Sequence, residues 1–246
     1  MTYSEEKKSG VVCFEEVNQI GILTIDNGSQ NKIPQPDFLD LSFLKEWISE
    51  QRLKGLIITG KGRHFSAGAD VDNIRANKDN PGYLREALKK GRDILNYIES
   101  LPIITVAAIS GICFGAGLEI ALSCQFRIGT ANALLAFPES NIGIMPGLTG
   151  TIRLSRIVGK SKALEIIITG RTINGEESYS LGLVDKIVPN KTHLSAAVQF
   201  INELTKNKSH QQIRSIIQSV NKSAVEKDAI AMEYESEMFL KLVENI

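Results

Sequence analysis

Two glutamates stand where a carboxylate is unusual. Glu119 is the only charged residue between Ile103 and Cys124, in the run IITVAAISGICFGAGLEIALSC. Burying an unpaired carboxylate costs on the order of several kcal/mol, so such a residue is rare unless it is paired or used. Glu139 follows in AFPESNIGIMPG, beside Pro138 and just past a predicted strand. Two neighbouring carboxylates could move protons on and off a carbon atom next to a polarised carbonyl.

Two loops of small residues could polarise that carbonyl. SAGAD, residues 66–70, and GICFGAG, residues 111–117, each lie near the end of an apolar strand, KGLIIT and IITVAAI respectively. Small residues let the backbone approach a ligand, and the second loop runs into a predicted helix whose first N–H groups are free. Side by side, the loops would offer two backbone donors to one oxygen. That is an oxyanion hole, in which one donor contributes about 3 kcal/mol to transition-state stabilisation.

Each feature alone also has an ordinary explanation. Glu119 could simply complement the dipole of a helix start, worth about 0.3–1 kcal/mol. Glu139 could be a loop charge, and either loop alone is most simply a tight turn. Two such loops together, at the ends of two buried strands, favour the site.

Three other motifs fail at a defining position. A dinucleotide-binding GxGxxG would need its third glycine at Ile120, and a P-loop ending in GKS would need its first glycine at Leu154. HFSAG resembles a nucleophile elbow around Ser66, but His64 replaces the first glycine and no acid–histidine pattern follows.

The composition indicates a packed globular protein. Of 246 residues, 43% are hydrophobic and 23% charged, and 28 basic residues balance 28 acidic ones. A balanced charge predicts no nucleic-acid partner. No metal site is expected, because the cysteines form no CxxC pair and the histidines are scattered. These residues are Cys13, Cys113, Cys124, His64, His193 and His210.

The protein is expected to be cytoplasmic and without membrane contact. The N-terminal segment MTYSEEKKSG has neither the apolar core of a signal peptide nor the composition of a transit peptide. The longest apolar run is interrupted by Glu119 and is rich in Gly, Ala and Ser, which indicates buried core.

The chain alternates between short apolar strands and amphipathic helices. This order predicts an α/β layered core over residues 1–190 and a helical C-terminal region over 191–246. In the latter, Leu194, Ala197, Phe200, Ile201 and Leu204 form an apolar stripe suited to oligomerisation. Strands are predicted at 11–17, 21–25, 54–60, 103–109 and 126–130, with a strand end at 134–139. Helices are predicted at 37–50, 82–100, 116–124, 149–159, 161–170 and in three stretches after 184–189.

Four segments together resemble the crotonase (enoyl-CoA hydratase/isomerase) superfamily. They are HFSAGAD, AISGICFGAGLEIALSC, FPESNIGIMPGLTGTIRLSRIVGKSKALEIIITG and GLVDKIVP, in the family's order and spacing. The resemblance runs from about Gly21 to Pro189. It implies a crotonase-like spiral of ββα units with a helical C-terminal region, and a homotrimer or hexamer.

The resemblance assigns roles to the two small-residue loops and the two glutamates. Ala69 and Ala116 match the two backbone donors of the oxyanion hole, and Glu119 and Glu139 match the two catalytic glutamates of the hydratases. It implies hydration or dehydration of an α,β-unsaturated acyl thioester, with coenzyme A thioester as substrate and no cofactor. Family usage favours Glu119 as base and Glu139 as acid, although the sequence leaves their order open.

Three further positions match the pocket. Ala67 and Asp70 correspond to lining residues, and Gly147 to a glycine whose backbone helps to place the reacting water. Asp72 stands where many members have a lysine that meets ligand phosphate, and the sequence ends at Ile246, before a basic helix that many members have. Both differences predict weak recognition of the nucleotide half of coenzyme A and keep an acyl-carrier-protein thioester as an alternative substrate.

Other activities of the superfamily remain open at this point. They are an enoyl isomerase, a decarboxylase, a polyketide dehydratase acting on a carrier protein, and a non-catalytic binding subunit. Retention of both Glu119 and Glu139 favours water chemistry over the others.

Overall fold

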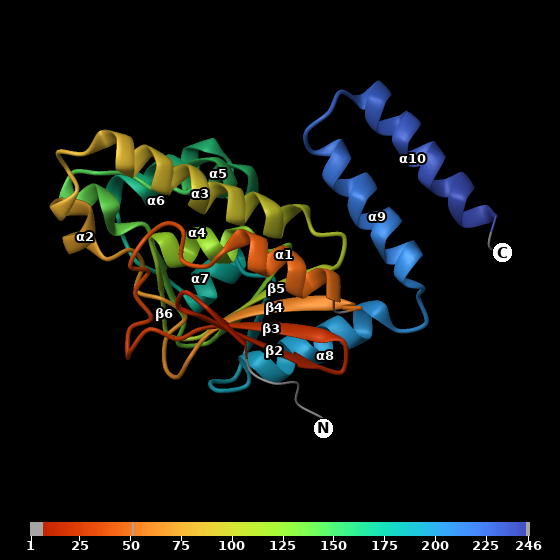
Figure 1. Ribbon diagram of the computed structural model, residues 1–246, viewed down its shortest axis with the longest axis horizontal. Coiled ribbons are helices and arrows are strands. Elements are labelled where there is room, and N and C mark those ends of the chain that lie inside the picture. The colour runs from red at the N-terminus through yellow and green to blue at the C-terminus, as the bar shows by residue number, and fades with distance from the viewer. Residues whose placement is uncertain (1–6, 51, 245–246) are drawn as a thin grey trace.

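A mostly parallel sheet forms the centre of the protein. The computed structural model describes residues 7–50 and 52–244 (Figure 1). The start of the predicted region 1–190, the end of the predicted region 191–246, and the first six residues of the N-terminal segment lie outside the described residues. The seven strands of the central sheet lie in the order β1-β2-β3-β4-β5-β7-β10, and β3, β4, β5, β7 and β10 run parallel. Their bounds are β1 Lys7–Ser9, β2 Val12–Val17, β3 Ile20–Ile25, β4 Gly55–Gly60, β5 Ile104–Ile109, β7 Phe126–Thr130 and β10 Lys186–Val188.

A smaller sheet and a set of helices complete the α/β core. The small sheet has the order β6-β8-β9, with β6 Ile112–Phe114, β8 Leu134–Ala136 and β9 Ile173–Asn174. The helices up to the last strand are α1 Leu41–Glu50, α2 Val71–Ala76, α3 Pro81–Ser100, α4 Ala116–Leu122, the 3-10 helix η1 Pro138–Ile142, α5 Gly150–Val158, α6 Lys160–Thr169 and α7 Gly175–Ser180. The C-terminal helices are α8 His193–Thr205, α9 His210–Ser223 and α10 Asp228–Val243.

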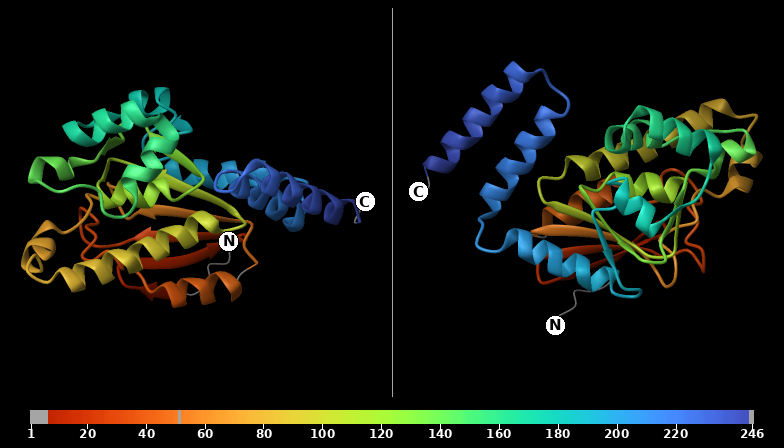
Figure 2. Two further views of the ribbon diagram at one scale, coloured as in Figure 1. Left: turned by 90° about the horizontal axis from the view of Figure 1, so that it is seen from above. Right: turned by 180° about the vertical axis from the view of Figure 1, so that it is seen from behind.

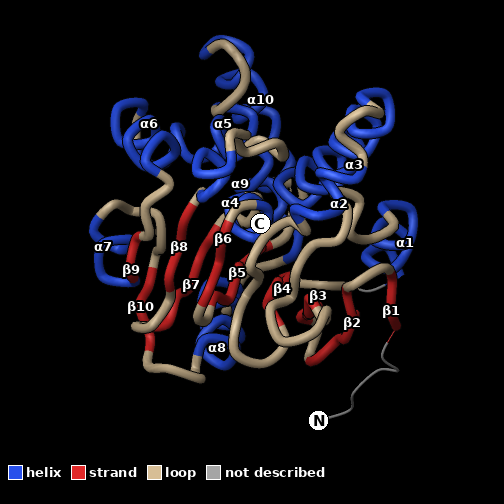
Figure 3. Tube along the Cα trace, turned by 90° about the vertical axis from the view of Figure 1, so that its left-hand side faces the viewer, coloured by secondary structure: helices blue, strands red, loops and turns tan. Residues whose placement is uncertain are grey.

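Both faces of β4 and β5, at the centre of the sheet, are buried, which explains why these two strands read as largely apolar runs. Side chains alternate between the faces with a period of two. Ile58 and Ala107 pack with the main core beneath α1, α3 and α4, whereas Ile57 and Val106 pack with Ile201 of α8 on the opposite face. Figure 3 shows α8 on one side of the strands and the other core helices across from it.

The apolar stripe of α8 packs against the chain's own sheet rather than lying free for assembly. Ala197 and Ile201 are fully buried there, and the ring of Phe200 meets that of Phe126 edge-on at 5.0 Å between centroids. The expectation that this stripe forms an oligomer face is therefore wrong.

The last two helices form an arm beyond the sheet. α9 and α10 lie against each other and extend away from the core in every view (Figures 1 and 2). The arm carries many exposed apolar side chains: Ile216, Val220, Val225, Ile230, Met232, Phe239, Leu240 and Val243. Among the described helices, none combines the length and the apolar character needed to cross a membrane.

The helix predicted over 37–50 begins later, at Leu41. The carboxylate of Asp40 accepts hydrogen bonds from the N–H groups of Ser42 and Phe43, which caps the first turn and stops the helix from extending backward. Phe38 is buried, but it lies in the preceding loop. The strand β6 and the short helices α2, η1 and α7 were not predicted, because each is too brief for a periodic pattern.

Candidate active site

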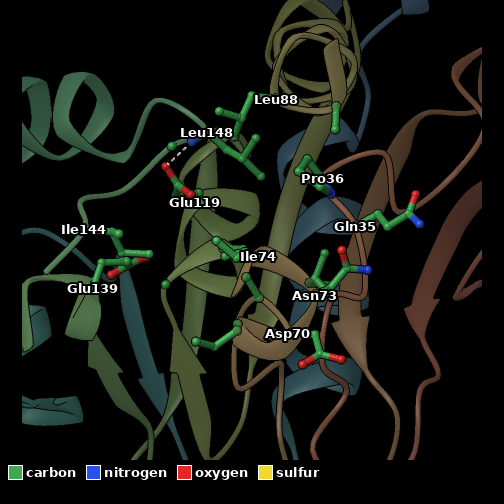
Figure 4. A pocket seen from close by; sticks show the side chains of 18 of the residues that line it. Gln35, Pro36, Asp70, Asn73, Ile74, Leu88, Glu119, Glu139, Ile144 and Leu148 are labelled. Atoms are coloured by element: carbon green, nitrogen blue, oxygen red, sulfur yellow. Dashed lines mark hydrogen bonds between the residues drawn. The ribbon is translucent and has the colours of Figure 1, made fainter. Parts of the chain in front are cut away.

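A largely apolar cavity of about 380 Å³ lies between the two small-residue loops, helices α2 and α3, and the segment from η1 to α5. Figure 4 shows how its side chains surround the space. The structure brings all seven predicted site residues to this cavity. They are Ala67, Ala69, Asp70, Ala116, Glu119, Glu139 and Gly147.

The two small-residue loops lie side by side. Ser66 N–H donates to the Ile112 carbonyl at 3.1 Å, and Phe114 N–H donates to the Ser66 carbonyl at 3.0 Å. Gly68 has a φ of +92°, and a Cβ there would lie 2.8 Å from the Phe114 carbonyl oxygen. Glycine is therefore required for the loops to approach this closely.

Each loop presents a backbone N–H without a protein acceptor. Asp70 N–H donates to the Ile33 carbonyl and Ile33 N–H to the Gly68 carbonyl, so the intervening N–H of Ala69 points away from Ile33. Ala116 is the first residue of α4, where helix geometry offers no acceptor. Within residues 7–50 and 52–244, neither N–H donates a hydrogen bond. The arrangement can bind one ligand oxygen through two donors.

Buried polar groups hold the first loop in place. Ser66 is fully buried; its Oγ donates to the Asn31 carbonyl and accepts from Gly68 N–H, so it shapes the loop. Asn31 is also fully buried, and its amide donates to the carbonyls of Lys61 and His64. Sequence reasoning missed Asn31, whose contacts lie 30 or more residues away.

Glu119 is held by the loop that precedes α5. It lies in α4, is only 2% exposed, and accepts two hydrogen bonds at one oxygen, Oε1, both at 2.7 Å. The donors are the N–H group of Leu148, whose bond Figure 4 shows, and the N–H group of Gly150. Sequence reasoning missed these two donors, although the neighbouring Gly147 was identified. The second carboxylate oxygen remains available to the cavity.

Glu139 approaches the same cavity from η1. Its Oε2 is buried and has no hydrogen-bond partner among the described residues. Gly115, with a φ of +50°, lies against it: a Cβ on Gly115 would be 2.7 Å from Glu139 Oε1. Any larger residue at position 115 would displace the carboxylate, which ties the second loop to Glu139.

The surroundings favour the protonated form of both carboxyl groups. Burial raises the pKa of Glu119 to about 8, and the nearby Glu139 adds to the rise while the two backbone N–H donors and Arg153 oppose it. Burial raises the pKa of Glu139 to about 7. Near neutral pH the pair can therefore both give and accept a proton.

Asp70 and Asp72 have different positions at α2. Asp70 lines the cavity and caps the helix, accepting from Asp72 N–H at 3.2 Å. Asp72 does not line the cavity; its side chain is 86% exposed and pairs with Arg75 at 3.2 Å. Arg75 therefore balances the charge of this carboxylate, so the weak nucleotide recognition predicted from position 72 would come from the missing lysine rather than from an unpaired negative charge.

Comparisons with known proteins identify the family of the chain. Residues 17–245 match the family described as enoyl-CoA hydratase/isomerase. A protein of Bacillus subtilis (strain 168) named as a probable enoyl-CoA hydratase is 34% identical over 221 residues, which cover 89% of this chain and 85% of that protein.

Solved structures share the fold. An enoyl-CoA hydratase from Bacillus anthracis superposes with a TM-score of 0.84 at 27% identity, covering 95% of this chain and 91% of that one. DspI from Pseudomonas aeruginosa superposes with a TM-score of 0.88 at 26% identity, covering 98% and 91%. The predicted α/β fold, a crotonase-like spiral with a helical C-terminal region, is confirmed. The chain belongs to the enoyl-CoA hydratase/isomerase family of the crotonase superfamily.

Proposed function

We propose that the protein is a lyase that adds water to an α,β-unsaturated acyl-CoA thioester, and removes it in the reverse direction, without a cofactor. One observation carries the proposal. Two carboxyl groups of raised pKa line the same cavity as two backbone N–H groups that have no acceptor in the described part of the chain. The membership of the enoyl-CoA hydratase/isomerase family agrees with this chemistry.

In the proposed reaction the N–H groups of Ala69 and Ala116 bind the thioester carbonyl oxygen. Withdrawal of electrons toward that oxygen makes the β-carbon electrophilic and stabilises the enolate that forms. A water held between Glu119 and Glu139 attacks the β-carbon as one glutamate accepts a proton from it. The other glutamate then delivers its proton to the α-carbon, and the carbonyl re-forms.

We assign Glu119 as the base and Glu139 as the acid, which requires the pair's single proton to lie on Glu139 when water attacks, although Glu119 has the higher pKa of the two, about 8 against about 7. The N–H donors of Leu148 and Gly150 favour an ionised Glu119, because a carboxylate accepts stronger hydrogen bonds than a carboxylic acid. Oε2 of Glu139 has no partner in the described part of the chain, which favours a proton there. We propose that Gly147 lines the water position and that Ala67 and Asp70 line the thioester, since all three border the cavity.

The other activities of the superfamily need fewer of these groups. A double-bond isomerase or a decarboxylase can function with one of the two glutamates, whereas hydration uses both. A non-catalytic subunit needs neither glutamate. The presence of both Glu119 and Glu139 at one cavity therefore favours hydration.

A comparison of three thioesters tests the function and the carrier. The same enoyl group would be presented on coenzyme A, on bare pantetheine and on an acyl carrier protein, and loss of the conjugated enoyl absorbance would be followed. We expect turnover of the coenzyme A thioester, with the carrier-bound group no faster. Turnover of the carrier-bound group alone would reassign the substrate, and no turnover of any of the three would contradict the proposed function.

A bell-shaped dependence of kcat/KM on pH is expected. The active pair has one proton: below about pH 7 both glutamates become protonated and no base remains, and above about pH 8 both ionise and no acid remains. The two apparent pKa values belong to the pair. An acid limb near the ordinary glutamate pKa of about 4.3 would contradict the buried, coupled arrangement.

We also propose a homotrimer or hexamer that assembles through the arm of α9 and α10, and a cytoplasmic location. Support for assembly comes from the exposed apolar side chains of the arm, which include Val220, Phe239 and Leu240 at more than 60% exposure. Support for the location comes from the cysteine pattern of the sequence, three cysteines without a CxxC pair, which is typical of a reducing compartment.

A further inference from the structure

Arg153 is a buried cation that contacts the segment whose backbone N–H groups bind Glu119. It belongs to α5 and is 3% exposed. Its Nη1 donates to the Leu148 carbonyl at 3.3 Å and to Thr149 Oγ1. Its Nη2 donates to Asn96 Oδ1 at 2.9 Å and to Glu99 Oε2 at 2.7 Å, both on α3. The guanidinium thus ties the 148–149 segment to α3.

The segment that Arg153 holds is the one that binds Glu119. Leu148 and Gly150 donate their N–H groups to Glu119 Oε1, and Thr149 lies between them with a φ of +81°. This left-handed conformation is uncommon for threonine, since it brings Cβ too close to the backbone. The hydrogen bonds from Arg153 to the Leu148 carbonyl and to the Thr149 hydroxyl can maintain this conformation. Without them, the N–H groups of Leu148 and Gly150 would no longer both point at Glu119 Oε1.

We propose that Arg153 is a positioning residue that fixes the Leu148–Gly150 segment and, through it, the Glu119 carboxylate in the orientation for proton transfer. The inference rests on the proposed function of Glu119. Arg153 does not line the cavity, so it acts through the segment rather than on the substrate.

The positive charge of Arg153 lowers the pKa of Glu119, as do the two N–H donors of the segment that Arg153 holds. The charged groups that act on Glu119 are Glu139 of η1, which favours the protonated form, and Arg153 of α5, which favours the ionised form. Arg153 in turn forms an ion pair with Glu99 of α3 at 2.7 Å, and its charge also acts on the buried thiol of Cys124. Loss of the cation should raise the pKa of Glu119, and neutralisation of Glu99 should lower it.

The experiment compares Arg153→Met, Arg153→Lys and Glu99→Gln with Arg156→Met. Arg156 is the matched control, because it lies on the same helix, is 56% exposed, and reaches the same Glu99 at 4.0 Å. For each variant, kcat, KM and the pH dependence of kcat would be measured with an enoyl-CoA thioester, together with circular dichroism.

We expect Arg153→Met to lower kcat by about 10- to 100-fold with little change in KM, and to move the alkaline limb of kcat, which follows the pKa of about 8 of Glu119, to higher pH. Arg153→Lys keeps the charge but not the planar guanidinium, so it should keep the alkaline limb in place and recover part of kcat. Glu99→Gln should move the alkaline limb to lower pH. Arg156→Met should change none of these.

Two results would overturn the inference. One is a folded Arg153→Met variant with the kcat and the alkaline limb of the wild type. The other, which decides the matter if Arg153→Met does not fold, is a Glu99→Gln variant whose alkaline limb stays in place. Glu119→Gln measured in parallel separates the two proposals: if it retains full turnover, the proposed function itself fails.

Discussion

Replacing Glu119 or Glu139 by glutamine is expected to lower the turnover of an enoyl thioester by about 100- to 10,000-fold for each substitution. Glutamine has nearly the shape of glutamate but neither accepts nor delivers the proton that the reaction needs. Its side-chain oxygen can still accept the N–H groups that Glu119 binds at 2.7 Å, so the local structure should persist. Rates followed by enoyl absorbance would measure the effect.

A matched substitution separates the loss of a proton carrier from a general effect of glutamine. Glu176 is an exposed glutamate of α7, outside the cavity. Glu176→Gln should retain the wild-type rate, and circular dichroism should show all three variants folded. Turnover within a few-fold of the wild type in both Glu119→Gln and Glu139→Gln would refute the two-glutamate mechanism.

Ala116→Pro is expected to lower turnover by about 100- to 1,000-fold, because proline has no N–H to donate to the thioester oxygen. The substitution should leave the helix intact. Ala116 is the first residue of α4, where proline is tolerated and the missing N–H breaks no helical hydrogen bond. A ring carbon would also occupy the place of the amide hydrogen, so both the donor and the space for the oxygen are lost.

Ala116→Gly is the matched control for the backbone donor. It keeps the N–H and removes only a methyl group, so it should retain most of the activity. Comparison of the two variants by single-turnover rates and circular dichroism distinguishes the donor from the side chain. A folded Ala116→Pro protein with undiminished turnover would exclude Ala116 from the oxyanion hole.

The parts of the site that could be predicted from sequence are those with an unusual local composition. Glu119 stood out as the one charge in an apolar run, and Ala69 and Ala116 lay in loops of small residues next to buried strands. Such signals are local, because burial and close backbone approach restrict which residues a short segment can contain. All of these residues line one cavity in the structure.

The supporting groups could not be predicted, because their partners are distant in sequence. Arg153 bonds Asn96 and Glu99 across 57 and 54 residues, and Asn31 reaches the His64 carbonyl across 33. An arginine in an amphipathic helix is ordinarily read as a solvent-exposed charge. Only the folded structure, which brings Asn96 and Glu99 of α3 to its guanidinium, shows that this arginine is buried and paired.

Two acids whose proton affinity rises on folding also make the fold itself depend on pH. Below about pH 4.5 they are protonated in the folded and the unfolded chain alike, and they subtract nothing from the free energy of unfolding. As the pH rises, the unfolded chain releases these protons first, so stability is lost until the pH passes the folded pKa values of about 7 for Glu139 and about 8 for Glu119. The loss is about 1.4 kcal/mol for each tenfold rise in proton affinity. The rest of the core must therefore supply the free energy that keeps this site assembled at the pH where it works, and the inactive glutamine variants should melt at higher temperatures than the wild type in alkaline solution.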